Sequence, residues 1–273
     1  MAGLVWQDGA TGFLQVAGRQ IEYGMWGPAP ASAPTATPTI VLLHEGLGCV
    51  ALWRDFPARL AQATGCGVFA FSRPGYGQSD PKPLPWPLDY MTREAGDTLA
   101  PVLDALAAPA VILLGHSDGA TIAAIHAGST EDRRLWGVVL MAPHFFTEPA
   151  GLASIAEART AFDSGDLRAR LGKYHHDPEN CFRGWNDSWL HPDFRDWNVS
   201  DCLDYIRVPV LVVQGEDDQY GSIAQVDEVA TRCYAPVDVM MLEDCRHAPH
   251  FDQAEATLAG IDSFCTRLRQ INS

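Results

Sequence analysis

Residues 115–119 read Gly-His-Ser-Asp-Gly, a pattern that can present a serine hydroxyl as a nucleophile. An aliphatic run, residues 111–114, precedes the pattern, and a helix-like run of small residues, 120–127, follows it. A strand, a sharp turn and a helix in this order hold the serine on a strained turn, where flanking glycines leave room for neighbouring backbone. We therefore predict that Ser117 is a nucleophile.

A serine hydroxyl is a poor nucleophile near neutral pH and needs a histidine base, which a carboxylate orients. Candidates follow two later strand-like runs: Asp217 and Asp218 after residues 209–213, and His247 and His250 after residues 237–241. Because the carboxyl ends of parallel strands meet at one edge of a sheet, this order predicts a Ser-Asp-His set at that edge. The choice within each pair stays open at this point.

Apolar runs alternate with helical segments along most of the chain. The predicted strands are residues 13–16, 20–23, 39–43, 68–71, 111–114, 138–141, 209–213 and 237–241. The predicted helices are residues 52–63, 92–108, 120–127 and 253–270. Continuous apolar strands between helices indicate a parallel sheet covered on both faces, and the opening hairpin adds antiparallel strands at one edge.

The alternation stops between residues 143 and 206, where the chain is polar, aromatic and helical. We expect residues 143–206 to form a helical cap, inserted into a core domain made of residues 1–142 and 207–273. The cap tryptophans either line an aromatic pocket or anchor the cap to a small core of its own. Residues 175–177, His-His-Asp, lack an i, i+4 pair and an obvious third ligand, so we predict no metal site.

With these residues in view, the chain resembles the α/β-hydrolase fold family over almost its whole length. The matching segments are residues 44–48, 72–79, 115–119, 215–218 and 247–249. The resemblance implies the α/β-hydrolase fold: a mostly parallel eight-stranded sheet with helices on both faces and an inserted helical cap. It also implies that Ser117 is the nucleophile, that Asp218 rather than Asp217 is the acid, and that His247 rather than His250 is the base.

The resemblance further implies an oxyanion hole made of two backbone N–H groups. One belongs to Asp118, and the other to the loop after residues 39–43, where Gly46 is the first choice and Leu47 and Glu45 are alternatives. Many family members have glycine where this chain has Glu45. The predicted substrate pocket is lined by Glu45, Leu47, Trp185 and Trp189.

Two carboxylates close to the predicted nucleophile need an interpretation. Asp118 either contacts a cationic or hydroxylated substrate or accepts N–H bonds in the first turn of its helix, and we favour the second. Glu45 is expected to pair with Arg73 or Arg54 rather than to touch substrate. His44 and His116 are predicted to be packing and hydrogen-bonding residues.

The composition bounds the class of protein. The 273 residues, 47% apolar and 19% charged, fit one large α/β globule. A net charge of −15 argues against nucleic-acid or anionic-membrane partners. We find no apolar run long enough for a membrane span and no leader at the start. Seven cysteines without a CxxC pair indicate reduced thiols, hence a cytoplasmic protein.

We therefore expect a serine hydrolase that cleaves an ester, lactone or thioester of a small acid, aromatic acids included, without a cofactor. We expect a monomer or homodimer whose partner is a small-molecule substrate. One alternative keeps these residues but cleaves a carbon–carbon bond in a dienoate, which needs a cation such as Arg183 or Arg195 for the substrate carboxylate. The other alternative is a receptor of the same fold without turnover.

Overall fold

The computed structural model describes residues 4–30 and 37–272. Within them eight strands form one sheet in the order β1-β2-β4-β3-β5-β6-β7-β8. The strands are β1 (Thr11–Val16), β2 (Arg19–Trp26), β3 (Thr39–Leu43), β4 (Gly67–Phe71), β5 (Val111–His116), β6 (Leu135–Met141), β7 (Val210–Gly215) and β8 (Val237–Leu242). The β1–β2 hairpin joins β4 in antiparallel pairing, and all other pairs are parallel. The predicted fold class is confirmed.

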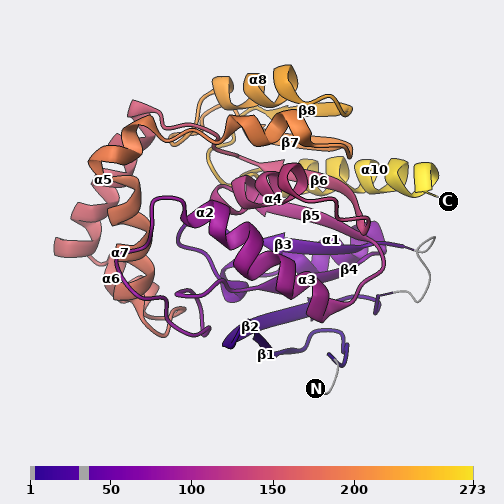
Figure 1. Ribbon diagram of the computed structural model, residues 1–273, viewed down its shortest axis with the longest axis horizontal. Coiled ribbons are helices and arrows are strands. Elements are labelled where there is room, and N and C mark those ends of the chain that lie inside the picture. Colours follow the sequence, from indigo (N-terminus) through magenta and orange to yellow (C-terminus); the bar gives the residue numbers. More distant parts are fainter. Residues whose placement is uncertain (1–3, 31–36, 273) are drawn as a thin grey trace.

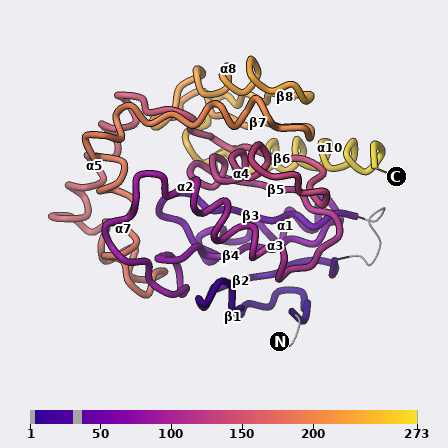
Figure 2. The backbone as a smooth tube through the Cα atoms, in the orientation of Figure 1, coloured from indigo at the N-terminus to yellow at the C-terminus, as the bar shows by residue number. Residues whose placement is uncertain are grey.

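Two apolar layers sandwich the sheet, because alternate residues of each inner strand face opposite sides. Ile40 and Leu42 of β3 belong to one layer, and Val41 and Leu43 belong to the other. The first layer is covered by α1 (Phe56–Thr64) and α10 (Ala254–Asn272). The second is covered by α3 (Ala100–Leu106), α4 (Asp118–Ser129) and α8 (Ile223–Arg232). Figure 2 shows α3 and α4 passing in front of the strands.

Two predicted helices differ from the observed ones. A 3-10 turn, η1 (Val50–Trp53), precedes α1, which starts at Phe56 with a proline in its first turn. The helix predicted for residues 92–108 consists of α2 (Tyr90–Arg93), a π-helical stretch η2 (Glu94–Leu99) and α3. Pro101 has no N–H for the regular helical ladder, and the widened turn places it in the first turn of α3.

The chain between β6 and β7 is helical, as predicted. It contains α5 (Pro149–Ser164), α6 (Leu167–Leu171), α7 (Pro178–Trp189) and the 3-10 turns η3 (Pro192–Asp196) and η4 (Ser200–Tyr205). Figure 1 shows α5, α6 and α7 grouped beyond one end of the sheet. The turn η4 instead packs against α4 and α8. The domain boundaries at residues 143 and 206 stay a prediction.

Helix α7 begins with strong local signals. The Asp177 carboxylate accepts a hydrogen bond from the Asn180 N–H at 2.9 Å, and Pro178 occupies the first helical position. This start fixes where the tryptophans of α7 lie.

In the part of the chain that the structure describes, no helix is both long and apolar enough to cross a membrane.

Candidate active site

Ser117 occupies a strained turn between β5 and α4. Its backbone has φ +53° and ψ −120°, a conformation that residues other than glycine rarely adopt. A Cβ at position 115 would lie 2.2 Å from the Gly119 carbonyl oxygen, and one at position 119 would lie 2.1 Å from the Leu43 carbonyl oxygen. The flanking residues must therefore be glycine, for the reason that the sequence suggested.

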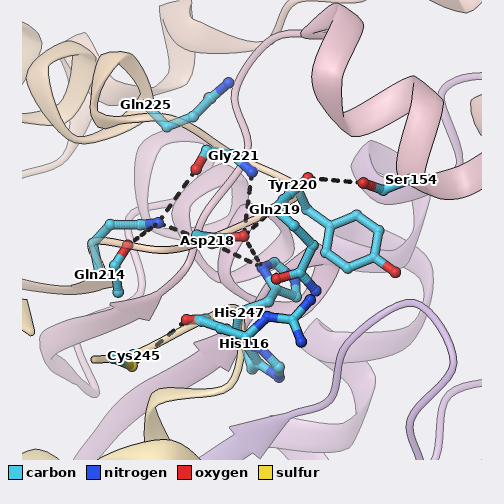
Figure 3. A network of polar contacts seen from close by, with 12 residues as sticks. His116, Ser154, Gln214, Asp218, Gln219, Tyr220, Gly221, Gln225, Cys245 and His247 are labelled. Carbon is cyan, nitrogen blue, oxygen red and sulfur yellow. Dashed lines mark hydrogen bonds and ion pairs between the residues drawn. The ribbon is translucent and has the colours of Figure 1, made fainter. Parts of the chain in front are cut away.

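Asp218 and His247 meet at the carboxyl ends of β7 and β8. The Nδ1 of His247 lies 2.9 Å from both carboxylate oxygens of Asp218, which also accepts hydrogen bonds from Gln214 Nε2 at 2.8 Å and the Tyr220 N–H at 2.8 Å (Figure 3). Burial opposes the charge, but His247 and these donors hold the pKa of Asp218 below its ordinary value. The anionic carboxylate places the Nδ1 proton, which leaves Nε2 free to accept one.

The rival residues lie elsewhere. Asp217 is exposed to solvent. His250 is buried between the rings of Trp53 and Phe56, with centroid distances of 5.0 and 5.3 Å, and burial lowers its pKa. The structure therefore pairs Asp218 with His247, the two residues that the resemblance selected.

His116 connects the turn at Ser117 to the loop that carries His247. Its Nε2–H donates to the His247 carbonyl oxygen at 2.6 Å, and its Nδ1 lies 3.6 Å from a Glu45 carboxylate oxygen. His44 bonds the Glu45 carbonyl oxygen and the Arg73 N–H through its two ring nitrogens. Both histidines are hydrogen-bonding residues, as predicted. Within the described chain no hydrogen bond joins the Ser117 hydroxyl to His247, although both line one pocket.

The carbonyl of Glu45 is held by three donors. It accepts hydrogen bonds from His44 Nδ1 at 2.7 Å, Arg73 Nη2 at 3.0 Å and the Gly48 N–H at 3.2 Å. In a trans peptide the N–H points opposite to the C=O, so the Gly46 N–H points away from these donors. Among the described residues, the Gly46 and Asp118 N–H groups donate to no protein atom. Both residues line the pocket.

The expectation for the side chain of Glu45 is wrong. Arg73 reaches the carbonyl oxygen of Glu45, not its carboxylate, because the buried guanidinium packs on the Tyr76 ring at 4.8 Å, beside the loop backbone. Arg54 packs on Phe251 instead. The carboxylate faces His116, and the nearby imidazole holds the Glu45 pKa below its ordinary value although burial opposes this.

The favoured interpretation of Asp118 is also wrong. The residue opens α4, as expected, but its Oδ2 accepts a hydrogen bond from the Tyr90 hydroxyl at 2.5 Å rather than from a backbone N–H. The Tyr90 oxygen in turn accepts one from Trp189 Nε1 at 3.0 Å. Tyr90 is only 1% exposed, and burial raises the Asp118 pKa. A phenol from α2 supplies the bond because it lies directly against the start of α4.

A partly open cavity of about 110 Å³ joins these groups. It is lined by Glu45, Gly46, Leu47, Ser117, Asp118, His144, Glu148, Gly151, Ile155, Trp185, Trp189, Tyr220 and His247. All the pocket residues predicted from the sequence are present. Trp189 serves both predicted purposes, because it also packs on Phe194 and Trp197 at 4.9 and 5.5 Å between ring centroids.

Sequence reasoning missed five lining residues: His144, Glu148, Gly151, Ile155 and Tyr220. The first comes three residues after β6 and the last five residues after β7, so the rule that strand ends carry functional groups points to both. The other three sit at the start of α5, whose placement no local pattern reveals.

His175 belongs to the His-His-Asp segment for which we predicted no metal site, and it forms hydrogen bonds to two loops. His175 Nδ1 accepts a hydrogen bond from the Gly77 N–H at 2.9 Å, and its Nε2–H donates to the Leu47 carbonyl oxygen at 3.0 Å. Through these two hydrogen bonds, His175 joins the loop after β3 to the loop after β4. Arg183 pairs with Asp163 and Glu179, and Arg195 is exposed; neither lines the cavity.

Known proteins share this architecture. VinJ is 22% identical, with a TM-score of 0.74 over 96% of this chain and 100% of that one. The enol-lactonase from Burkholderia xenovorans LB400 is 18% identical, with a TM-score of 0.71 over 93% and 100%. Est816, described as an N-acyl homoserine lactone degrading enzyme, is 21% identical, with a TM-score of 0.70 over 93% and 100%. No curated protein sequence matches. The profile described as "Alpha/beta hydrolase family" matches residues 40–260, and the chain therefore belongs to that family.

Proposed function

We propose that the protein is a serine hydrolase that cleaves a carboxylic ester or lactone of a small acid through an acyl-enzyme intermediate. The carrying observation is that Ser117 and His247 line one cavity while His247 is bonded to the Asp218 carboxylate. A base oriented by a buried carboxylate beside a strained serine is the arrangement that activates a hydroxyl.

The proposed reaction uses each group in turn. Ser117 attacks the carbonyl carbon while His247 Nε2 takes the hydroxyl proton, and Asp218 stabilises the resulting imidazolium. The Gly46 and Asp118 N–H groups, which have no protein acceptor among the described residues, receive the oxyanion. His247 then protonates the leaving alcohol and activates a water molecule that releases the acid.

The resemblance in fold supports an ester or lactone bond. Two of the similar structures are named for lactone chemistry, and a lactone is a cyclic ester that the same attack opens. The dienoate alternative loses its support, because neither Lys nor Arg is among the described residues that line the cavity. A substrate carboxylate would therefore lack a cationic partner there.

Intact-mass labelling with a fluorophosphonate tests the proposal, together with turnover of p-nitrophenyl esters of increasing acyl size. We expect wild type to gain one label and to hydrolyse short or aromatic esters, and Ser117→Ala to do neither. Ser129→Ala, at the exposed end of the same helix, is the matched control and should behave as wild type. Labelling or hydrolysis retained in Ser117→Ala contradicts the proposal. Stoichiometric ligand binding without turnover supports a receptor instead.

A further inference from the structure

Carboxylates gather around the proposed active-site cavity. Glu45, Asp118 and Glu148 line it, and neither Lys nor Arg does so among the described residues. The carboxylate of Asp218 is bonded to His247 Nδ1 and does not line the cavity. The question is which of the lining charges is left without a positive partner.

Two of the three lining carboxylates have local compensation. Asp118 accepts the Tyr90 hydroxyl bond, and the buried Arg73 guanidinium acts on it electrostatically. Glu45 faces His116 at 3.6 Å. A buried arginine acts on the first and the His116 ring lies beside the second, so neither carboxylate is the first choice for a ligand.

Glu148 is different, because all its partners are uncharged. One carboxylate oxygen accepts from the Ser222 hydroxyl at 2.6 Å, and the other accepts from the Ser222 N–H at 3.0 Å and Gln225 Nε2 at 2.8 Å. No Lys or Arg of the described chain pairs with Glu148. Although burial opposes it, these donors hold the pKa of Glu148 below its ordinary value, so the charge persists.

His144, which acts electrostatically on Glu148, does not offset that charge. His144 also lines the cavity, and its ring lies 5.6 Å from both the Trp189 and the His247 rings. Burial, with the nearby His247, lowers the pKa of His144 to about 3, so the ring is uncharged at neutral pH. His144 therefore adds no positive charge beside Glu148.

Aromatic walls complete the environment. Trp185, Trp189 and Tyr220 line the cavity, and the face of an aromatic ring attracts a cation. An ammonium group there would meet the Glu148 carboxylate and aromatic side chains. A carboxylate would meet like charge and no cationic donor.

We propose that this pocket binds the ammonium group of a cationic substrate next to Glu148 and excludes carboxylates. The substrate class is then an ester or lactone whose enclosed part bears a protonated amine. This inference rests on the proposed hydrolase function for the bond that is cleaved, but the charge preference of the pocket is measurable without turnover.

The test uses the full-length protein and measures how well each of three ligands of similar shape protects it against fluorophosphonate labelling. The ligands are benzylammonium, benzyl alcohol and benzoate. We expect benzylammonium to protect at roughly tenfold lower concentration than benzyl alcohol, the effect of one partly screened charge, and benzoate to protect least. Added potassium chloride should weaken protection by benzylammonium and leave that by benzyl alcohol unchanged. Equal protection by the three ligands, or best protection by benzoate, overturns the inference.

The variant Glu148→Gln retains an acceptor oxygen but removes the charge. It should lose most of the tenfold preference for benzylammonium, with protection in each variant measured relative to that variant's own labelling rate without ligand. Glu131→Gln, an exposed change before β6, is the control and should keep the preference. If Glu148→Gln does not fold, the test is the effect of potassium chloride on protection of wild type by benzylammonium. Protection that salt does not weaken overturns the inference. If wild type is not labelled, the hydrolase proposal fails, and calorimetric titration with the three ligands still decides the charge preference.

Discussion

The indole of Trp185, on α7, lies directly against Gly46, on the loop after β3. A Cβ added at Gly46 would stand 2.1 Å from Trp185 Nε1 and 2.4 Å from its Cδ1. This contact holds the cap against the loop that offers the second proposed oxyanion donor.

Gly46→Ala should therefore displace that donor. We expect kcat/KM on a p-nitrophenyl ester to fall about 100-fold, the usual loss when one oxyanion donor is misplaced. Trp185→Ala removes the obstructing ring, so adding Gly46→Ala to it should cost little further activity. A Gly46→Ala single variant as active as wild type shows that this contact does not position the donor.

Asp218→Asn should leave the loop folded but spoil the orientation and tautomer of His247. We expect kcat to fall by roughly 10⁴-fold, the scale of such a loss in serine hydrolases. Asp217→Asn, one residue earlier and exposed, should retain activity within a factor of about two and serves as the control. Comparable losses in the two variants contradict the assignment of the acid.

Tyr90→Phe removes a hydroxyl that has a partner on each side. The Asp118 carboxylate oxygen and the Trp189 N–H both lose a bond in a buried position, at a cost of about 1–3 kcal/mol each. Denaturant unfolding should show this loss in the free energy of unfolding. Tyr205→Phe, at a side chain 61% exposed, should change it by less than about 0.5 kcal/mol. An unchanged midpoint for Tyr90→Phe means that the two partners find water.

Acid should destabilise the protein through its buried histidines. Burial lowers the pKa of His44, His144, His175 and His250. Below about pH 6.5 these histidines take up protons in the unfolded chain but stay neutral in the native chain. The free energy of unfolding therefore falls as the pH falls. For His144 this loss begins near pH 6.5 and levels off near pH 3.

His144→Asn should accordingly reduce the difference in unfolding free energy between pH 7 and pH 5. Urea unfolding at the two pH values measures it. His191→Asn, at a half-exposed ring, should leave the difference as in wild type. A difference that His144→Asn does not reduce shows that the ring is already protonated in the native protein.

The sequence sufficed for the sheet and for the residues at its strand ends, because strand, turn and helix signals are local. It could not show that Tyr90 bonds Asp118, since the pair depends on how α2 packs across the start of α4. It also could not show that Arg73 holds the carbonyl rather than the carboxylate of Glu45, a choice made by burial of the guanidinium. The position of Glu148 at the cavity could not be predicted either, because its partners, Ser222 and Gln225, are more than 70 residues away in the sequence.

The hydrogen bond from His116 to the carbonyl of His247 spans 131 positions of the chain. During synthesis the Ser117 turn leaves the ribosome long before the loop that carries His247, since the chain is made from the N-terminus onward. The early chain therefore holds Ser117 without its proposed base. If the proposed function holds, activity begins only when β7 and β8 have docked, and a chain stalled before β8 should be inactive.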